Sequence, residues 1–151
     1  MQKSTAFRLF FAFSLLVLGA DSAMAQNACE TALVGKSYTC EITSVDFPTG
    51  SSTVSMSFEH ASWPGVNTDF QMAYGGTIPY ACACMPSGKP GKLKGPEKSK
   101  TFSCIKAWSD GAGNDVVIDG TVAGGGSKIL KGRWLSNSPG SDSYVYSCVE
   151  N

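Results

Sequence analysis

Two cysteines one residue apart, Cys82 and Cys84, offer the most direct chemistry in the chain. Because residues i and i+2 of a strand project from the same face, the two sulfurs could together hold a soft metal such as Cu(I), with Met85 beside them. The same two thiols could also act as a redox pair. The sequence therefore suggests a metal or redox protein as one functional hypothesis.

The position of these cysteines in the alternating pattern of the strand favours a structural role instead. Both alternate with the apolar Ile78 and Tyr80, so their sulfurs are expected to point into a core, and exported thiols tend to oxidise. A direct Cys82–Cys84 bond would close too small a ring on an extended backbone. We therefore expect no metal, no cofactor and three longer disulfides. The expected pairs are Cys84 with Cys104, Cys40 with Cys148, and Cys29 with Cys82, although the sequence alone leaves the connectivity open.

The lysine loop (residues 87–100) carries the most concentrated charge in the chain. Its five lysines are Lys89, Lys92, Lys94, Lys98 and Lys100. One interpretation is a contact surface for an anion, a glycan or an exported protein, and the other is a solvated hairpin loop whose lysines discourage aggregation. The loop lacks the interleaved aromatic residues of single-stranded nucleic-acid sites, and the whole chain has a formal charge of +0. We therefore expect no nucleic-acid partner.

The N-terminus has the three parts of a secretory signal peptide. Lys3 and Arg8 precede an apolar run over residues 9–20, and Ala23-Met24-Ala25 has the small-x-small pattern of a cleavage site. The apolar run is about twelve residues long, whereas a membrane-spanning helix needs about twenty. We expect cleavage near Ala25, a periplasmic or secreted location, and one domain over residues 26–151 with no membrane span.

Apolar and polar residues alternate with period two along the whole of this domain, and no run has a convincing helical period. The expected strands lie around Tyr38–Ile42, Val54–Phe58, Phe70–Tyr74, Ile78–Cys84, Phe102–Trp108, Val116–Val122, Leu130–Trp134 and Tyr144–Cys148. Short turns rich in glycine and proline separate most of them and leave no room for crossover helices. We therefore predict an all-β, single-domain, antiparallel up-and-down β-barrel of about eight strands, stapled by disulfides, with a two-sheet β-sandwich as the alternative.

Four aromatic residues are candidates for binding a ligand in the mouth of such a barrel, namely Trp63, Trp108, Trp134 and Tyr144. The tryptophans are also candidates for filling the core. No catalytic arrangement is visible: His60 is the single histidine and is expected at a strand end on the surface. We expect no enzyme, and a hydrolase that uses converging carboxylates is left as an alternative.

Two short stretches resemble calycins, the lipocalin and avidin-like barrels. Gly35-Lys36-Ser37-Tyr38 lies where such chains carry an opening Gly-x-Trp motif, and Leu130-Lys131-Gly132-Arg133-Trp134 lies near the place of a late-strand tryptophan in avidin-like chains. This resemblance implies a fold and no binding residues. In addition, Tyr38-Thr39-Cys40 is similar to the opening strand of small periplasmic inhibitors of lysozyme or proteases, which are disulfide-stapled β-barrels.

These observations lead to one functional expectation with alternatives. We expect a monomeric, non-enzymatic exported binding protein that either holds a small apolar or aromatic ligand in the barrel mouth or presents loops to another exported protein. The first alternative is an inhibitor of an exported hydrolase, acting through the lysine loop. The second is the metal or redox protein built on Cys82 and Cys84.

Overall fold

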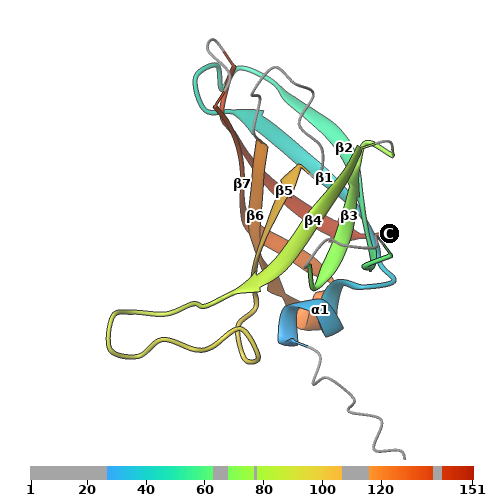
Figure 1. Ribbon diagram of the computed structural model, residues 1–151. Coiled ribbons are helices and arrows are strands. Elements are labelled where there is room, and N and C mark those ends of the chain that lie inside the picture. Colours follow the sequence, from blue (N-terminus) through green and yellow to red (C-terminus); the bar gives the residue numbers. More distant parts are fainter. Residues whose placement is uncertain (1–26, 63–67, 77, 107–115, 138–140) are drawn as a thin grey trace, which may run out of the picture.

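The structure is a computed structural model that describes residues 27–62, 68–76, 78–106, 116–137 and 141–151 (Figure 1). Its elements in chain order are helix α1 (Ala28–Leu33), strands β1 (Ser37–Ser44), β2 (Ser51–His60), β3 (Phe70–Tyr74), β4 (Ile78–Met85), β5 (Thr101–Lys106) and β6 (Val116–Ala123), the 3-10 turn η1 (Gly124–Gly126), and strands β7 (Lys128–Ser136) and β8 (Tyr144–Glu150). The expected signal peptide over residues 1–25 lies outside the described residues.

Each strand pairs antiparallel with its neighbour in sequence, and β8 returns to pair with β1, which closes an eight-stranded barrel. A short connection can join only neighbouring antiparallel strands, so the up-and-down order follows from the short links between successive strands. The closing pair places Cys40 opposite Cys148 and Tyr38 opposite Glu150. The predicted barrel is therefore confirmed, and the two-sheet sandwich alternative is wrong.

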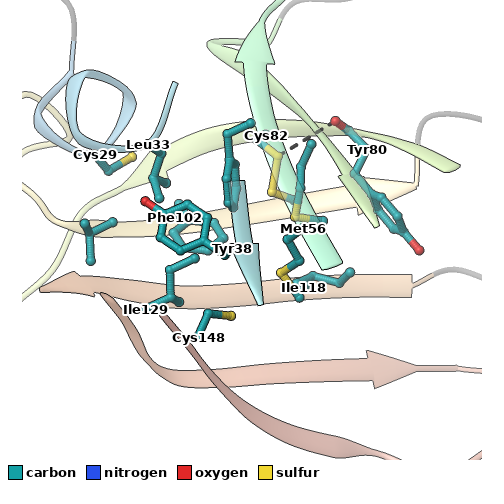
Figure 2. Close-up of a cluster of buried hydrophobic side chains, with 14 of the residues drawn as sticks. Cys29, Leu33, Tyr38, Met56, Tyr80, Cys82, Phe102, Ile118, Ile129 and Cys148 are labelled. Atoms are coloured by element: carbon teal, nitrogen blue, oxygen red, sulfur yellow. Dashed lines mark hydrogen bonds between the residues drawn. A yellow bond between two sulfur atoms is a disulfide. The ribbon is translucent and has the colours of Figure 1, made fainter. Parts of the chain in front are cut away.

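Aromatic side chains fill the middle of the barrel, where Tyr38 and Phe102 lie close together (Figure 2). The Phe58 ring meets Tyr38 and Phe102 edge to face, with ring centroids 5.6 Å and 5.5 Å apart, and meets Phe70 at 6.1 Å. Edge contacts of this kind suit the ring quadrupoles. Smaller buried side chains surround the four rings, including Met56, Met72, Ile118, Val122 and Ile129. The centre of the barrel is thus occupied by packed side chains.

Helix α1 covers one end of the barrel, which we call the helix end (Figure 1). Cys29 and Leu33 of α1 are buried, and the helix contacts β4, β6 and η1. Just inside this end, the Tyr38 hydroxyl donates a hydrogen bond of 2.6 Å to the carbonyl oxygen of Gly126. The helix was not predicted, because six residues make fewer than two turns and reveal no helical period. In the described part of the chain, no helix has the length and apolar character needed to cross a membrane.

All six cysteines form disulfides, so the prediction of three bridges is confirmed. The bond between Cys40 and Cys148 is the predicted one and joins β1 to β8. The other two predicted pairs are wrong, because Cys82 is bonded to Cys104 and Cys84 to Cys29. The register of the β4–β5 hairpin explains the exchange. It places Cys82 directly opposite Cys104, while Cys84 lies opposite Phe102, nearer the helix end where α1 brings Cys29.

Strand β7 contains a bulge that corrects a further prediction. Period-two counting puts Leu130 and Trp134 on one face, but Ile129 is buried and Leu130 is 41% exposed. The register shifts between Ile129 and Gly132, where Lys131 has a left-handed backbone with φ of 53°. A bulge adds one residue to the strand and so reverses the alternation of its faces. The shared face that period-two counting gives to Leu130 and Trp134 is therefore wrong.

Removal of the closing disulfide should destabilise the barrel more than removal of the hairpin disulfide. Cys40 and Cys148 are separated by 108 residues and Cys82 and Cys104 by 22. The chain-entropy relation gives losses of about 5 and about 3 kcal/mol in the free energy of unfolding, respectively. Urea unfolding of Cys40→Ala/Cys148→Ala and of Cys82→Ala/Cys104→Ala, followed by tryptophan fluorescence, measures both losses. A larger loss from the second variant would contradict this ranking.

Candidate functional site

The barrel end opposite α1 (Figure 1), which we call the mouth, contains a stack of three aromatic rings. The Trp134 ring of β7 lies between Tyr144 of β8 and Tyr74 of β3, with centroid distances of 4.7 Å and 5.8 Å and interplanar angles of 24° and 29°. Tyr80 meets Tyr74 edge on at 6.4 Å. The structure thus brings together Trp134 and Tyr144, which were predicted to bind a ligand.

A cavity of about 260 Å³ opens beside this stack. Two rings and three polar residues line it, namely Trp134, Tyr144, Ser136, Ser141 and Asp142. The Asp142 carboxylate accepts a hydrogen bond of 3.3 Å from the Ser44 hydroxyl at the end of β1. An aromatic wall beside hydroxyl and carboxylate oxygens suits a small planar ligand that carries hydrogen-bond donors.

The indole Nε1–H of Trp134 is buried, and none of the described residues supplies it with a hydrogen-bond acceptor. A buried donor without a partner costs about 1–3 kcal/mol, so such a group in a folded protein requires a specific explanation. Among the described residues, Trp134 thus combines an unpartnered buried donor with a place in the lining of the neighbouring cavity.

Burial makes the tyrosines around the mouth resistant to ionisation. It raises the pKa of Tyr74 to about 12, with smaller contributions from the neighbouring phenols of Tyr80 and Tyr144. Burial also raises the pKa of Tyr80 and that of Tyr146, whose hydroxyl donates a hydrogen bond of 2.8 Å to the Asp119 carbonyl oxygen. At neutral pH, Tyr74, Tyr80 and Tyr146 therefore surround the mouth with uncharged rings.

Two of the four residues predicted to bind a ligand, Trp63 and Trp108, lie outside the described residues, so their roles stay predictions. The structure adds Tyr74, which the sequence identified only as an inward-facing strand residue. Strand alternation shows which side chains point inward, but the contact between Tyr74 and Trp134 joins β3 to β7 across the barrel. Only the closed arrangement of all the strands brings these two residues together.

The lysine loop projects from the barrel beside the helix end (Figure 1). Its five predicted lysines are exposed, and none of the ion pairs in the described ranges involves them. Ser87 and Lys94 exchange two backbone hydrogen bonds, of 3.1 Å and 2.7 Å, which make the outer part of the loop a short hairpin. Leu93 is 64% exposed between Lys92 and Lys94. The loop thus presents positive charge around an apolar side chain.

The base of the lysine loop is firmly attached to the barrel. One disulfide joins β4 to β5 through Cys82, and another joins β4 to α1 through Cys84. On the other side of the loop, Ser99 is fully buried and its hydroxyl accepts a hydrogen bond of 3.0 Å from the Thr101 N–H. The Lys100 carbonyl oxygen also accepts a hydrogen bond from β6. The loop therefore leaves the barrel from a fixed point.

The thiol chemistry suggested for Cys82 and Cys84 loses its basis, because each sulfur is bonded to a different partner. His60 is exposed at the end of β2, as predicted, and its Nδ1 lies 3.8 Å from Oε1 of Glu30. Within the described ranges, no group of three or more histidine, cysteine, aspartate or glutamate side chains could hold a metal ion.

A larger cavity, of about 480 Å³, lies on the outer face of the barrel where β5, β6 and β7 run side by side. We call it the outer groove. It was not predicted, because it lies beside register shifts in β6 and β7 that no alternation pattern reveals. The available signal was the pair of glycines inside strand patterns, Gly120 and Gly132, since an isolated glycine in a strand often marks a bulge.

No protein-family model, curated protein or solved structure matches the chain. The features of the molecule that bear on function are therefore the mouth, the lysine loop and the outer groove. Of the stretches that resemble calycins, the first places Tyr38 in the core and the second places Trp134 in the mouth stack.

The raised phenol pKa values predict a loss of stability at alkaline pH. The pKa of Tyr74 rises from 10.0 to about 12 on folding. The stability that this shift contributes to the folded state is therefore fully present below about pH 10 and is lost as the pH approaches about 12. Tyr74→Phe should therefore make the free energy of unfolding fall less steeply over this range. Urea unfolding at a series of pH values, with phenolate absorbance at 295 nm, measures the effect. An unchanged slope in Tyr74→Phe would contradict the assignment.

Proposed function

We propose that this protein is a non-enzymatic, exported binding protein that holds a small aromatic ligand at the barrel mouth. Its three disulfides support export, because such bonds persist mainly in oxidising compartments. One observation carries the binding proposal: no described residue supplies an acceptor to the buried indole N–H of Trp134, which lines a cavity of about 260 Å³. A ligand that accepts this hydrogen bond would offset the cost of burying the donor.

The packed core limits the size of the ligand. Tyr38, Phe58 and Phe102 occupy the middle of the barrel, so a long apolar ligand has no deep chamber to enter. The mouth cavity is also slightly smaller than the range of roughly 300–1,000 Å³ typical of drug-sized ligands. These two facts favour a ligand with a single ring.

The arrangement of the mouth also limits the ligand's chemistry. Trp134 stacks on Tyr74 and Tyr144, and its one polar side-chain atom, Nε1, has no acceptor among the described residues. Asp142 supplies carboxylate oxygens to the same cavity. A suitable ligand is therefore a planar molecule with an acceptor for Trp134 and a donor for Asp142.

Benzamide has this pattern, because its carbonyl oxygen accepts and its amide nitrogen donates. Titration of the ¹⁵N-labelled protein with benzamide should shift the Trp134 indole proton resonance downfield in a saturable manner, since the N–H gains an acceptor. Trp134→Phe identifies the resonance among those of the three tryptophans. Toluene, which has the ring but no hydrogen-bonding groups, should produce no such downfield shift.

Two variants of β8 test whether the mouth is responsible for this shift. Tyr144→Ala removes one wall of the cavity and should abolish saturation by benzamide, whereas Val145→Ala, at an exposed neighbouring position, should preserve it. Mass spectrometry of natively purified protein should also detect a retained small molecule. No saturable shift at Trp134, or equal losses in both variants, would refute binding at the mouth.

A second candidate function is inhibition of an exported hydrolase through the lysine loop. The observation that favours it is the exposed Leu93 between Lys92 and Lys94 on a projecting hairpin with a fixed base. An exposed apolar side chain flanked by cations, next to the turn of the hairpin, would suit an active-site cleft that contains carboxylates, because opposite charge steers and aligns the partner.

Replacement of all five loop lysines by serine should weaken inhibition of a susceptible hydrolase by at least tenfold, because the electrostatic attraction is lost. The test enzymes are lysozyme and trypsin, which carry carboxylates in the catalytic cleft and the specificity pocket, respectively. Inhibition by the original protein should also weaken as NaCl is raised, and that of the serine variant should not. Leu93→Ser tests the exposed apolar side chain, with Leu135→Ser, at an exposed position of β7, as its control. No inhibition of either enzyme, or inhibition unaffected by the lysine replacements, would oppose this function.

A further inference from the structure

The outer groove combines apolar surface with hydroxyl groups. Phe102 and Gly120 are among its lining residues, and Met85, at the base of the lysine loop, adds a partly exposed thioether. A Cβ atom at Gly120 would lie 2.8 Å from Ile129 and 3.0 Å from Phe102, so the core packing requires glycine there. The cavity of about 480 Å³ lies within the usual range for small-molecule sites.

Two cations reach this groove, but only one of them is neutralised. Arg133 donates hydrogen bonds to both carboxylate oxygens of Asp119, from Nε at 3.1 Å and from Nη2 at 2.7 Å. Lys131 lines the same cavity, and no ion pair involves it within the described ranges. Thr101, Ser103 and Thr121 also border the groove. The lining therefore has one uncompensated positive charge and several hydroxyl donors.

The backbone at Lys131 is strained. Among the described residues it is the single non-glycine residue with a positive φ, which is 53°. A left-handed conformation is unfavourable for an L-residue with a Cβ, and glycine adopts it without this penalty. Strained residues occur often at binding sites, where the surrounding structure holds a side chain in place. Lys131 therefore has both the strained backbone and the ammonium group that lines the groove without an ion pair among the described residues.

From these features we infer that the outer groove binds a small organic anion, with one carboxylate or sulfonate group on an apolar body. The anionic group would contact Lys131 and the neighbouring hydroxyls, and the apolar body would lie against the exposed Met85 side chain and the Gly120 backbone. One uncompensated cation matches one negative charge, which favours a small monoanion over a polyanion such as nucleic acid. This site is separate from the mouth, so it is independent of the ligand proposed there.

A matched pair of fluorescent probes tests this inference. 8-Anilinonaphthalene-1-sulfonate has an apolar aromatic body and one anionic group, and N-phenyl-1-naphthylamine has nearly the same body without the charge. Lys131→Gly should weaken binding of the sulfonate about threefold to fivefold, as expected for a partly exposed ion pair. It should leave binding of the uncharged probe unchanged. The variant should also be at least as stable as the original protein, because glycine relieves the positive φ.

Three further variants locate the probe. Lys128→Gln removes an exposed lysine from the same strand outside the groove and should leave sulfonate binding unchanged. Thr121→Trp should fill the groove and weaken binding of both probes. Trp134→Phe alters the mouth and should affect neither probe. Near-ultraviolet circular dichroism confirms that each variant is folded, since the sulfonate also binds partly unfolded protein.

The inference is overturned if Lys131→Gly leaves sulfonate binding unchanged, or if it weakens both probes equally. It is also overturned if Trp134→Phe abolishes sulfonate binding while Lys131→Gly does not, because the probe would then occupy the mouth. Loss of binding in Lys131→Gly with full retention in Trp134→Phe supports the groove, whatever the benzamide experiment shows.

Discussion

The pairing of β1 with β8 is the interaction on which the rest of the structure depends. It leaves neither strand with a free edge, and it sets Cys40 opposite Cys148 inside the barrel. It also places Ser44 of β1 beside Tyr144, where the Ser44 hydroxyl donates a hydrogen bond to Asp142, one of the residues that line the mouth cavity. Closure therefore produces the core and the candidate ligand site together.

The packing of the core explains why every candidate site lies at the surface. Small eight-stranded barrels either fill their interior with side chains or keep room for a ligand. Here Tyr38, Phe58, Phe70 and Phe102 fill the centre, and α1 covers the helix end. The surfaces left for binding are the mouth, the lysine loop and the outer groove. Each is a local feature of an otherwise closed barrel wall.

Local alternation was sufficient to predict the strands and their up-and-down order, because short connections restrict which strands can pair. It was insufficient wherever the answer depended on register. Cys82 and Cys84 lie on one face, so only the pairing of β4 with β5 decides which of them meets Cys104. Likewise, the bulge at Lys131 turns Leu130 outward, and the contact of Tyr74 with Trp134 crosses the barrel. Both depend on relations between strands that a single strand does not encode.

The positions of the disulfides also constrain the order in which the chain can become rigid. Cys82 and Cys104 lie on strands joined by one loop, so they can meet early in folding. Cys40 must wait for Cys148 on the last strand, 108 residues later. A chain that emerges N-terminus first therefore carries an unpaired β1 edge and an unbonded Cys40 through most of its emergence. During that interval the free edge of β1 can pair with another chain, and Cys40 can form a non-native disulfide. Both hazards end when β8 pairs with β1.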